Sequence, residues 1–346
     1  MFPPLTFGIF DQNDASGRPV AQQYAERLRL IEFYDANGFG CYHMSEHHAT
    51  PLSTTPSPNV FLAAVSQRTR RIRFGPLVYL LPIYNPLRLA EEICMLDHLS
   101  EGRFEFGVGR GASPHELGYM GVDPGRNREM YAEAFDVVRQ ALTQRQKGGT
   151  LDHQGEFWTF RDVPITFEPF RKPMPQMWYA AASPESAVWP AHNRVNVVCG
   201  GPPARVRATT DRYRAEHPGG DHAPLLGINR YVVVAPTDAE ARAIGMRAWG
   251  PFFKHFRTLW DLHGTEPVNA KLPPAFETVL ASGNAIVGSP ATVREAIARQ
   301  AEEAGTNYFS CNFTFGDQSA EEAMRSVRLF AKEVMPAFGP LPLAAE

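Results

Sequence analysis

Three ionisable side chains, Glu46, His47 and His48, stand next to one another and follow the short apolar run Gly40–Met44. That run has the composition of a β-strand, so the three side chains are expected at its C-terminal end. In α/β barrels this end carries the catalytic groups. Because histidine titrates near neutral pH, the cluster could supply a general base or hydrogen-bond donors. The alternative is a set of loop residues that only cap the rim of a barrel.

A metal site is a weaker interpretation of the same segment. His43 and His47 are spaced i, i+4, which brings two imidazoles to one face only in a helix. Their surroundings indicate strand and turn, and no glutamate directly follows His43 as it would in a helical zinc motif. We therefore expect no metal at this segment.

Glycines dominate the second cluster, Gly107-Val108-Gly109-Arg110-Gly111-Ala112, which follows another strand-like run. The cluster formally matches the dinucleotide fingerprint G-x-G-x-x-G/A, but that fingerprint opens a long helix. Here Pro114 and the pair Pro124-Gly125 interrupt any such helix. The acidic residue that the fingerprint requires about 20 residues later is also missing. We therefore reject a Rossmann dehydrogenase.

The same glycines would let a ligand lie against the backbone, and Arg110 adds a charge suited to phosphate. Arg126 and Arg128 follow at the start of the next predicted helix. For such arginines the alternative is a solvated or ion-paired position on the surface.

Ser183 and Pro184 form a helix start, with serine as the N-cap and proline at the first helical position. At the C-terminal face of a barrel, a helix start could also bind a phosphate through the serine hydroxyl and backbone N–H. Taken together, the three clusters predict one rim with an anion site, glycines and histidines. They indicate a barrel enzyme that binds a phosphorylated cofactor.

Short apolar strands alternate with longer helical segments along the whole chain. The predicted strands are Leu5–Phe10, Gly40–Met44, Ile72–Leu81, Arg103–Val108, Gln176–Ala181, Arg194–Cys199, Leu226–Val234 and Asn307–Asn312. The predicted helices include Val20–Ala36, Leu87–Leu99, Asn127–Leu142, Thr292–Ala304 and Ala320–Met335. Eight strand–helix units predict a closed (β/α)₈ barrel, the TIM-barrel class, with an open doubly wound sheet as the competing architecture.

Two stretches interrupt this alternation. Gly148–Pro175 is rich in aromatic residues, proline and glycine, and we interpret it as an inserted hairpin. Trp249–Gly283 begins with an aromatic helical pattern and becomes loop-like, and we interpret it as an excursion before the last strand that could cover the barrel mouth. Neither stretch resembles a linker, so residues 1–346 are expected to form a single domain.

Composition indicates which partners are not expected and which cellular compartment is favoured. The net charge of -3 gives no basic patch, so nucleic acid and anionic membranes are not expected partners. Apolar runs are far shorter than the ~20 residues of a membrane span, and the N-terminus lacks a signal-peptide pattern. The four cysteines lie far apart without a Cys-x-x-Cys pair, which favours free thiols and a cytoplasmic setting.

Several segments together resemble the bacterial-luciferase-like family of flavin-dependent monooxygenases, and the luciferase catalytic subunit in particular. The Leu-Asp-x-Leu-Ser-x-Gly-Arg run at 96–103 is the most specific of them. The matching segments are Ser45–His48, Arg73–Gly75, Leu81-Pro82, Asn85-Pro86, Ala90–Glu92, Leu96–Phe104, Gly107–Gly111 and Asn284–Pro290.

The resemblance implies a barrel that binds reduced FMN, with dioxygen adding at the flavin C4a carbon and the resulting peroxide oxygenating an organic substrate. It implies that Arg110 and Ser183 hold the phosphate, with Arg128 as a further candidate. His47 would be the base or hydrogen-bonding residue beside the flavin. The flavin ring would pack against a cis peptide bond between Leu77 and Val78.

Two positions beside the implied cofactor depart from the luciferase catalytic subunit. That subunit has a reactive cysteine where this chain has Gly109, and a glutamate where it has Ala182. These differences argue against light emission and long-chain aldehyde specificity. The paired histidines and the Gly-Arg-Gly run, which the non-catalytic luciferase subunit lacks, favour a working active site.

Two alternatives remain open at this point. Some barrels of this superfamily use the deazaflavin F420 and transfer hydride without oxygen, although the motifs favour FMN. The chain could also be a non-catalytic flavin-binding partner subunit. Because we recognise no nicotinamide-binding motif in the sequence, reduced FMN would come from a separate flavin reductase. The resemblance further implies a homodimer.

Overall fold

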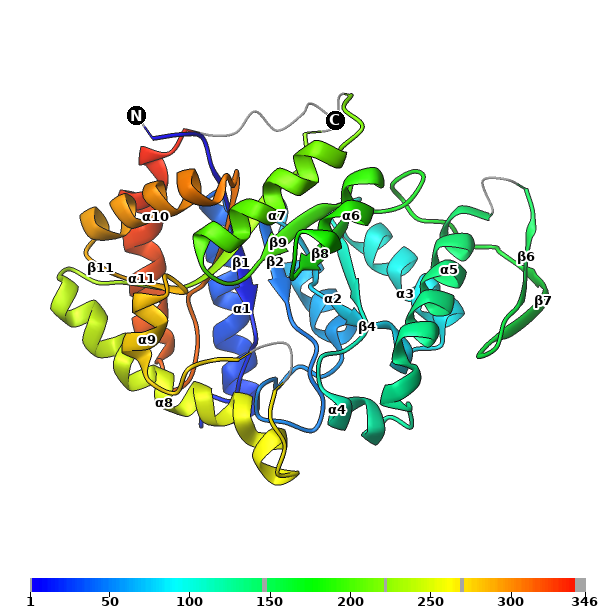
Figure 1. Cartoon of the computed structure of the whole chain (residues 1–346), viewed down its shortest axis with the longest axis horizontal. Coiled ribbons are helices and arrows are strands. Elements are labelled where there is room, and N and C mark those ends of the chain that lie inside the picture. The colour runs from blue at the N-terminus through cyan, green and yellow to red at the C-terminus, as the bar shows by residue number, and fades with distance from the viewer. Residues whose placement is uncertain (1, 145–147, 221–222, 268–270, 340–346) are drawn as a thin grey trace.

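Eight parallel strands form the centre of the molecule, and all eight predicted strands are confirmed. The computed structural model describes residues 2–144, 148–220, 223–267 and 271–339 (Figure 1). The strands are β1 (Thr6–Asp11), β2 (Cys41–Met44), β3 (Arg73–Pro76) with its continuation β4 (Tyr79–Leu80), β5 (Phe106–Gly109), β8 (Met177–Ala181), β9 (Asn196–Cys199), β10 (Leu226–Val234) and β12 (Tyr308–Asn312).

The order of the strands shows that the sheet closes on itself. Neighbours follow the order β3-β2-β1-β12-β10-β9-β8-β5-β4, and these pairs are parallel. β3 pairs with β2, while β4, on the same run of chain, pairs with β5. A bridge between Phe74 and Phe104 joins the same edges earlier in β3. Because one run pairs on both sides, the sheet is a barrel, and the open-sheet alternative is wrong.

Helices surround the barrel (Figure 1). The longer ones are α1 (Val20–Ala36), α2 (Pro58–Arg68), α3 (Pro86–Leu99), α5 (Asn127–Gln144), α7 (Pro203–Glu216), α8 (Asp238–Leu262), α10 (Pro290–Ala304) and α11 (Ala320–Leu329). The shorter ones are α4 (Pro114–Tyr119), α6 (Val188–His192) and α9 (Phe276–Ala281). None of the described helices is long and apolar enough to cross a membrane.

Two segments that carry the family resemblance are helix starts. The Asn85 side chain accepts hydrogen bonds from two backbone N–H groups of α3, and Ser289 accepts one in α10. A proline follows each cap at the first helical position, where its missing N–H has no cost. The role that the structure shows for Asn85 and Ser289 is therefore to cap helices.

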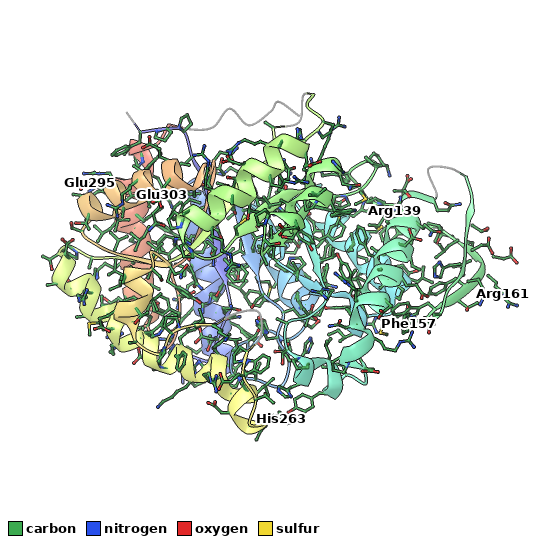
Figure 2. The ribbon with its side chains drawn as sticks, viewed as in Figure 1. Arg139, Phe157, Arg161, His263, Glu295 and Glu303 are labelled. Atoms are coloured by element: carbon green, nitrogen blue, oxygen red, sulfur yellow. The ribbon has the colours of Figure 1, made fainter. Side chains whose placement is uncertain are left out.

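The inserted hairpin is confirmed within the predicted stretch. β6 (Thr150–Gln154) and β7 (Thr159–Pro164) pair antiparallel and project from the barrel beside α5 (Figure 1). Figure 2 places Phe157 and Arg161 on this projection, well away from the barrel mouth. The Glu133 carboxylate of α5 accepts backbone hydrogen bonds from the hairpin turn, which fixes the hairpin to the helix.

The excursion before the last strand differs from the prediction in two ways. Its helix, α8, begins at Asp238 rather than Trp249, because Thr237 caps it and small buried residues such as Ala241 and Ala248 continue its inner face. It is followed by α9 and by a short strand, β11 (Ala285–Gly288), which pairs with the second half of β10 and was not predicted.

Helix α11 also ends earlier than predicted. Regular α-helix stops at Leu329 and continues as a π-helical turn, Phe330–Val334, and a 3-10 turn, Met335–Ala337. Phe330 and Val334 are buried in the main core, so packing continues the helical face although the hydrogen-bond pattern changes.

Candidate active site

The Val78 side chain fills the space that two glycines leave on β5. A Cβ atom built on Gly107 would lie 2.9 Å from Val78 Cγ1, and one on Gly109 would overlap Val78 Cγ2. The Leu77–Val78 peptide bond is cis, as the resemblance implied. The two glycines therefore admit a neighbouring side chain, whereas the sequence suggested that they admit a ligand directly.

Small residues are exposed where β8 and β9 end. Trp178 of β8 is fully buried in the barrel interior, and Ala180, two residues later on the same face of the strand, is exposed. Ala182 and Gly200, which follow β8 and β9, are exposed as well. The C-terminal ends of these two strands are therefore accessible from outside.

His47 lies on this rim and is oriented by a buried carboxylate. Its Nδ1 atom lies 3.1 Å from Glu116 Oε1, and Glu116 is only 4% exposed. Glu116 belongs to α4, whose N-cap Ser113 accepts a hydrogen bond from the Glu116 backbone N–H. A carboxylate on Nδ1 favours the tautomer that carries the proton there, which leaves Nε2 as an acceptor.

Glu46 and His48, the other two members of the cluster, form a separate group of hydrogen bonds. Glu46 Oε1 accepts from Tyr84 Oη at 2.6 Å and lies 2.9 Å from His48 Nε2. Glu46 Oε2 accepts from the backbone N–H of Leu80 at 2.8 Å. Glu46 therefore ties the loop after β2 to the strand segment that follows Val78.

His43 does not join the rim. It is fully buried inside the barrel, edge-on to Trp178 with ring centroids 4.5 Å apart, and its Nδ1 atom lies 3.7 Å from Cys41 Sγ. Burial lowers the pKa of His43 to about 3, so the ring is neutral at physiological pH. His43 and His47 thus lie in different environments, and the four cysteines of the chain are buried free thiols.

Arg110 follows β5 and Ser183 follows the neighbouring strand β8, so their loops lie side by side at the mouth. Arg110 is exposed and has no ion-pair partner among the described residues. Burial raises the pKa of Tyr131 on α5, and the charge of Arg110 opposes that rise, which places the guanidinium near this helix.

The turn at Ser183 has the predicted cap contact, because Ser183 Oγ accepts from the Ser186 backbone N–H at 3.4 Å, but it opens a 3-10 turn instead of a regular α-helix. Ser186 Oγ donates to Ser183 O at 2.6 Å and accepts from the backbone N–H of Ser183 at 3.0 Å. These side-chain bonds compete with helical ones, so a 3-10 turn, Glu185–Ala187, comes first and α6 has only five residues. The Ser183 hydroxyl remains at the mouth, but no long helix points its N-terminus there.

The two arginines after Pro124 have different roles. Arg126 forms an ion pair with Glu156, and its guanidinium lies 4.7 Å from the Phe157 ring centroid, so it holds the hairpin. Arg128, near the start of α5, is exposed and has no ion-pair partner among the described residues.

Helix α8 closes one side of the mouth. Together with His47 and Glu116 it encloses a cavity of about 50 Å³. The remaining lining is mainly apolar: Thr50, Leu52, Ala112, Ser113, Phe256, Leu259, Trp260 and Pro267. The excursion thus lies over the rim beside His47, as the sequence suggested.

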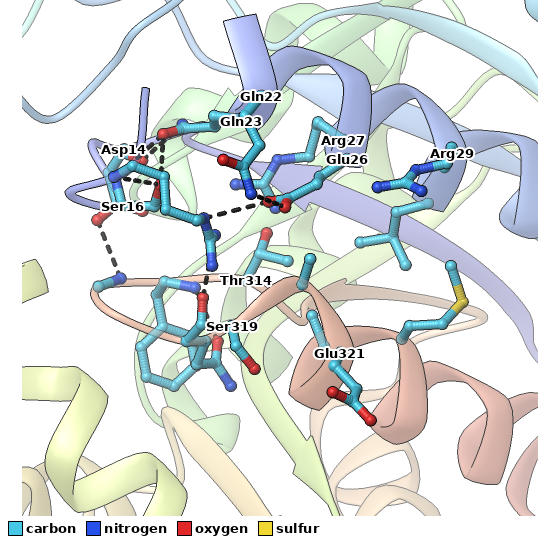
Figure 3. Close-up of a pocket in the computed structure, with 18 of the residues that line it drawn as sticks. Asp14, Ser16, Gln22, Gln23, Glu26, Arg27, Arg29, Thr314, Ser319 and Glu321 are labelled. Carbon is cyan, nitrogen blue, oxygen red and sulfur yellow. Dashed lines mark hydrogen bonds and ion pairs between the residues drawn. The ribbon is translucent and has the colours of Figure 1, made fainter. Parts of the chain in front are cut away.

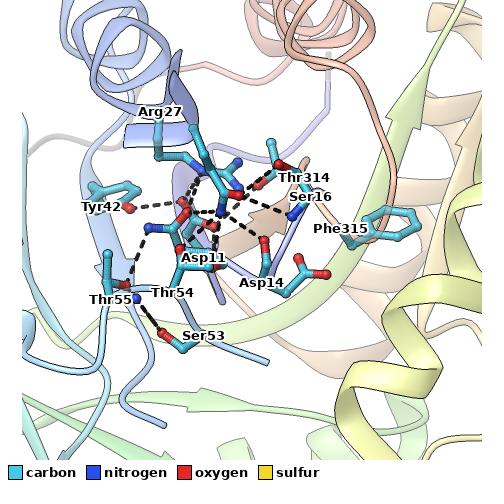
Figure 4. A network of polar contacts seen from close by, with 12 residues as sticks. Asp11, Asp14, Ser16, Arg27, Tyr42, Ser53, Thr54, Thr55, Thr314 and Phe315 are labelled. Carbon is cyan, nitrogen blue, oxygen red and sulfur yellow. Dashed lines mark hydrogen bonds and ion pairs between the residues drawn. The ribbon is translucent and has the colours of Figure 1, made fainter. Parts of the chain in front are cut away.

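A polar network joins the loops after β1, β2 and β12 around Asp11 and Asp14 (Figure 4), and Asp14 connects it to α8. Buried Asp14 accepts from the Gly316 backbone N–H and binds His255 Nδ1 of α8, each at 2.9 Å. Burial raises the pKa of Asp14, although the hydrogen bond from His255 opposes the rise. Next to it, Asp11 pairs with Arg27 at 3.2 Å.

Comparison with known proteins assigns this arrangement to a family. Residues 5–308 match the family model described as luciferase-like monooxygenase. The chain belongs to the luciferase-like monooxygenase family. It is 42% identical to the uncharacterized protein y4wF of Sinorhizobium fredii, over 97% of this chain and 98% of that one. It is 28% identical to the 4-hydroxyprotoasukamycin monooxygenase of Streptomyces nodosus subsp. asukaensis, over 90% and 86% of the two chains.

A third relative is named as one part of a two-part system. The oxygenase component of the flavin-dependent trigonelline monooxygenase of Acinetobacter baylyi is 31% identical over 51% of this chain and 48% of that one. The named relatives place the luciferase-like protein among enzymes that catalyse monooxygenation.

Solved structures agree on the fold. Monooxygenase RslO1 of Streptomyces bottropensis superposes with a TM-score of 0.84 at 25% identity, covering 97% of this chain and all of that one. The oxygenating constituent of the 3,6-diketocamphane monooxygenase of Pseudomonas putida, solved with FMN, has a TM-score of 0.79 at 21% identity, over 98% and 100%. An F420-dependent reductase of Methanopyrus kandleri has a TM-score of 0.69 at 18% identity, over 97% and 100%. The latter two show the fold alone.

Sequence reasoning missed two side chains of this luciferase-like site. Glu116 carries no local signal, because it acts on His47, a partner that the fold brings near. Arg205 of α7, which donates from Nη2 to Ala182 O at 2.6 Å, was also missed. It adds a cation beside the Ser183 turn.

Proposed function

We propose that this luciferase-like protein is an FMN-dependent monooxygenase that uses reduced flavin and dioxygen to oxygenate a small organic substrate. The observation that carries the proposal is the convergence of three features at one barrel mouth. They are Arg110, which has no ion-pair partner among the described residues, the exposed small residues Ala180 and Ala182, and His47 held by Glu116.

The residues present fit an FMN molecule. Its phosphate would be held by Arg110 and the Ser183 hydroxyl, with Arg128 and Arg205 as further cations at the same loops. Its flat ring would lie against Val78 and over the small exposed residues Ala180 and Ala182. Larger side chains at these two positions would take up the space beside Val78.

When bound, reduced FMN would supply the two electrons and the site of oxygen activation. One oxygen atom then enters the substrate and the other leaves as water. His47 would hold or move a proton at Nε2, while Glu116 fixes the ring through Nδ1. Phe256, Leu259 and Trp260 exclude water from the space beside His47.

Reduced flavin would come from a separate reductase, and the protein would act in the cytoplasm as a homodimer. No nicotinamide motif is present in the sequence, and the trigonelline relative is named as an oxygenase component. The four free cysteines are compatible with a reducing compartment.

Anaerobic titration with reduced FMN, followed by rapid mixing with oxygenated buffer, tests the proposal. We expect saturable binding, then a slow return of oxidised-flavin absorbance that substrate accelerates with formation of an oxygenated product. Oxidation of NADH by the purified protein alone would contradict a separate reductase. Binding of F420 in place of FMN would identify a hydride-transfer enzyme, and flavin binding without product from any substrate would identify a partner subunit.

A further inference from the structure

A second cavity lies outside the candidate active site, between α1 and α11. Its volume is about 590 Å³, within the range of about 300–1,000 Å³ that small-molecule sites occupy. Figure 3 shows Arg29 on α1 and Glu321 on α11, the two helices that flank it. The loops after β1 and β12 form its inner end.

Apolar side chains cover part of this cavity. Leu30 of α1 and Ala323 of α11 are buried, and Met324 of α11 is partly buried. All three line the cavity. A ligand with an apolar body would cover the exposed part of Met324 and gain binding free energy by removing it from water.

Charged groups line the cavity with an excess of arginine. The carboxylates are Asp14, Glu26 and Glu321, and the cations are Arg18, Arg27, Arg29 and Arg328. Arg18 pairs with Glu26 at 3.1 Å, and Arg27 with Asp11 at 3.2 Å. Asp14 pairs with His255. The charged side chains at the inner end of the cavity therefore have partners within the protein.

Arg29 and Arg328 are the two lining cations without an ion-pair partner among the described residues. The guanidinium carbon of Arg328 lies over the Phe33 ring, 5.9 Å from its centroid. Met324 and Arg328 are spaced i, i+4 on α11, so they share a face of the helix. A carboxylate bound here would place its apolar body against Met324.

A buried amide at the inner end lacks a partner. Gln318 lines the cavity and is 4% exposed. Its Oε1 atom accepts from the Phe315 backbone N–H at 2.9 Å, but its Nε2 atom donates to none of the described residues. A buried donor without a hydrogen bond destabilises the folded protein. A ligand with an acceptor at this position would therefore gain binding free energy.

We propose that this cavity is a second ligand site for a short amphipathic carboxylate with an oxygen acceptor at its far end. The carboxylate would bind Arg29 and Arg328, the apolar body would cover Leu30 and Met324, and the far acceptor would accept a hydrogen bond from Gln318 Nε2. An eight-carbon diacid monoester is small enough for the volume of the cavity.

The site is separate from the one proposed for FMN, and the inference does not depend on that function. Some of its lining residues also contact α8. Asp14 lines the cavity and also binds His255 of α8, the helix that covers His47. A ligand here would therefore contact the network that positions the cover.

Three matched probes separate the parts of the proposal. Monomethyl suberate has a carboxylate and an ester acceptor, octanoate has only the carboxylate, and dimethyl suberate has no charge. Isothermal titration of the full chain should show affinities in that order. Absence of binding by monomethyl suberate would overturn the proposal, as would equal binding of dimethyl suberate.

Variants then locate the site. Arg29→Ala with Arg328→Ala should weaken monomethyl suberate about tenfold, while Arg88→Ala, an exposed arginine on α3, should not. Gln318→Glu keeps the acceptor for Phe315 and removes the donor, so it should erase the advantage over octanoate. If thermal unfolding shows that Gln318→Glu is misfolded, Met324→Trp, which fills the cavity, replaces it. Wild-type affinity in the double arginine variant would refute the site.

Discussion

The Nδ1 atom of His47 and the Oε1 atom of Glu116 lie 3.1 Å apart, although 69 positions separate the two residues in the sequence. His47 lies in the loop after strand β2, and Glu116 lies in the short helix α4. Because the carboxylate is buried and the imidazole is half-buried, the pair fixes which ring nitrogen faces the mouth.

We predict that Glu116→Gln lowers kcat about tenfold or more while KM and the affinity for reduced FMN stay near wild type. The amide can no longer hold the imidazole through a charged hydrogen bond, so the ring loses its orientation. His47→Asn should lower kcat by about 10²–10⁴. The double variant should be no worse than His47→Asn, because both residues act through one ring.

Glu129→Gln on the exposed side of α5 serves as the control for Glu116→Gln. Glu116→Asp should restore part of the rate if the carboxylate positions the ring. A parallel loss of kcat and of thermal stability in Glu116→Gln would instead assign Glu116 to the fold alone.

A second prediction concerns the contact between Val78 and β5. Gly109→Ala should destabilise the protein by about 1–3 kcal/mol, because the added methyl would overlap Val78 Cγ2. Val78→Ala removes that methyl, so the double variant should recover most of the loss. Thermal or urea unfolding of the two single variants and the double variant measures the coupling.

Gly118→Ala provides the matched control, because a Cβ at Gly118 would meet nothing within 4 Å. It should leave stability unchanged or raise it slightly, since alanine favours helix. Independent, additive losses in Gly109→Ala and Val78→Ala would show that the two side chains do not compete for one space.

The barrel was predictable because its strands are short apolar runs between helices with clear starts. Leu226–Val234 was predicted with the observed bounds. β11 was missed because Ala285–Gly288 comes directly after the turn at Gly283, at the end of the stretch interpreted as an excursion. The start of α8 was missed because small residues on its inner face give a weak periodic signal.

The candidate site was only partly predictable, for a physical reason. Motifs marked His47 and Arg110, because residue type and position after a strand are local properties. The partner of His47, the cation Arg205 and the side chain that fills Gly109 are set by tertiary contact. At Ser183 the cap was predictable from the local sequence, but the 3-10 turn was not, since Ser186 competes for the backbone groups that a regular helix would use.

The phosphate site gives a third prediction. Arg110→Ala should weaken FMN binding about 10–100-fold, because a charged hydrogen bond to phosphate is lost. Riboflavin, which lacks the phosphate, should bind wild type and variant equally. Arg128→Ala and Arg205→Ala rank the further cations by the same titration. An equal loss for riboflavin would mean that Arg110 supports the ring pocket rather than the phosphate.

The last prediction concerns pH and the start of α11. Glu322 accepts hydrogen bonds from Arg247 and the Ser319 backbone N–H, and Arg247 lowers the pKa of Glu322 from 4.5 to about 2. The folded-state pKa is below the unfolded one, so the contribution is fully present above the unfolded pKa and is lost as pH falls toward the folded value. Glu322→Gln should therefore cost about 2 kcal/mol at neutral pH.

Urea unfolding of wild type and Glu322→Gln across about pH 3.5 to 7 measures this difference. The difference in unfolding free energy between the two proteins should shrink as pH falls below the unfolded-state pKa. In that range Glu322 of the unfolded wild type becomes protonated while Glu322 of the folded protein is still ionised, which favours the unfolded state. Glu321→Gln, an exposed neighbour in the same helical turn, is the control and should show a small gap at every pH. A gap that stays constant with pH would mean that Glu322 stabilises α11 through its packing and cap geometry, with no contribution from its charge.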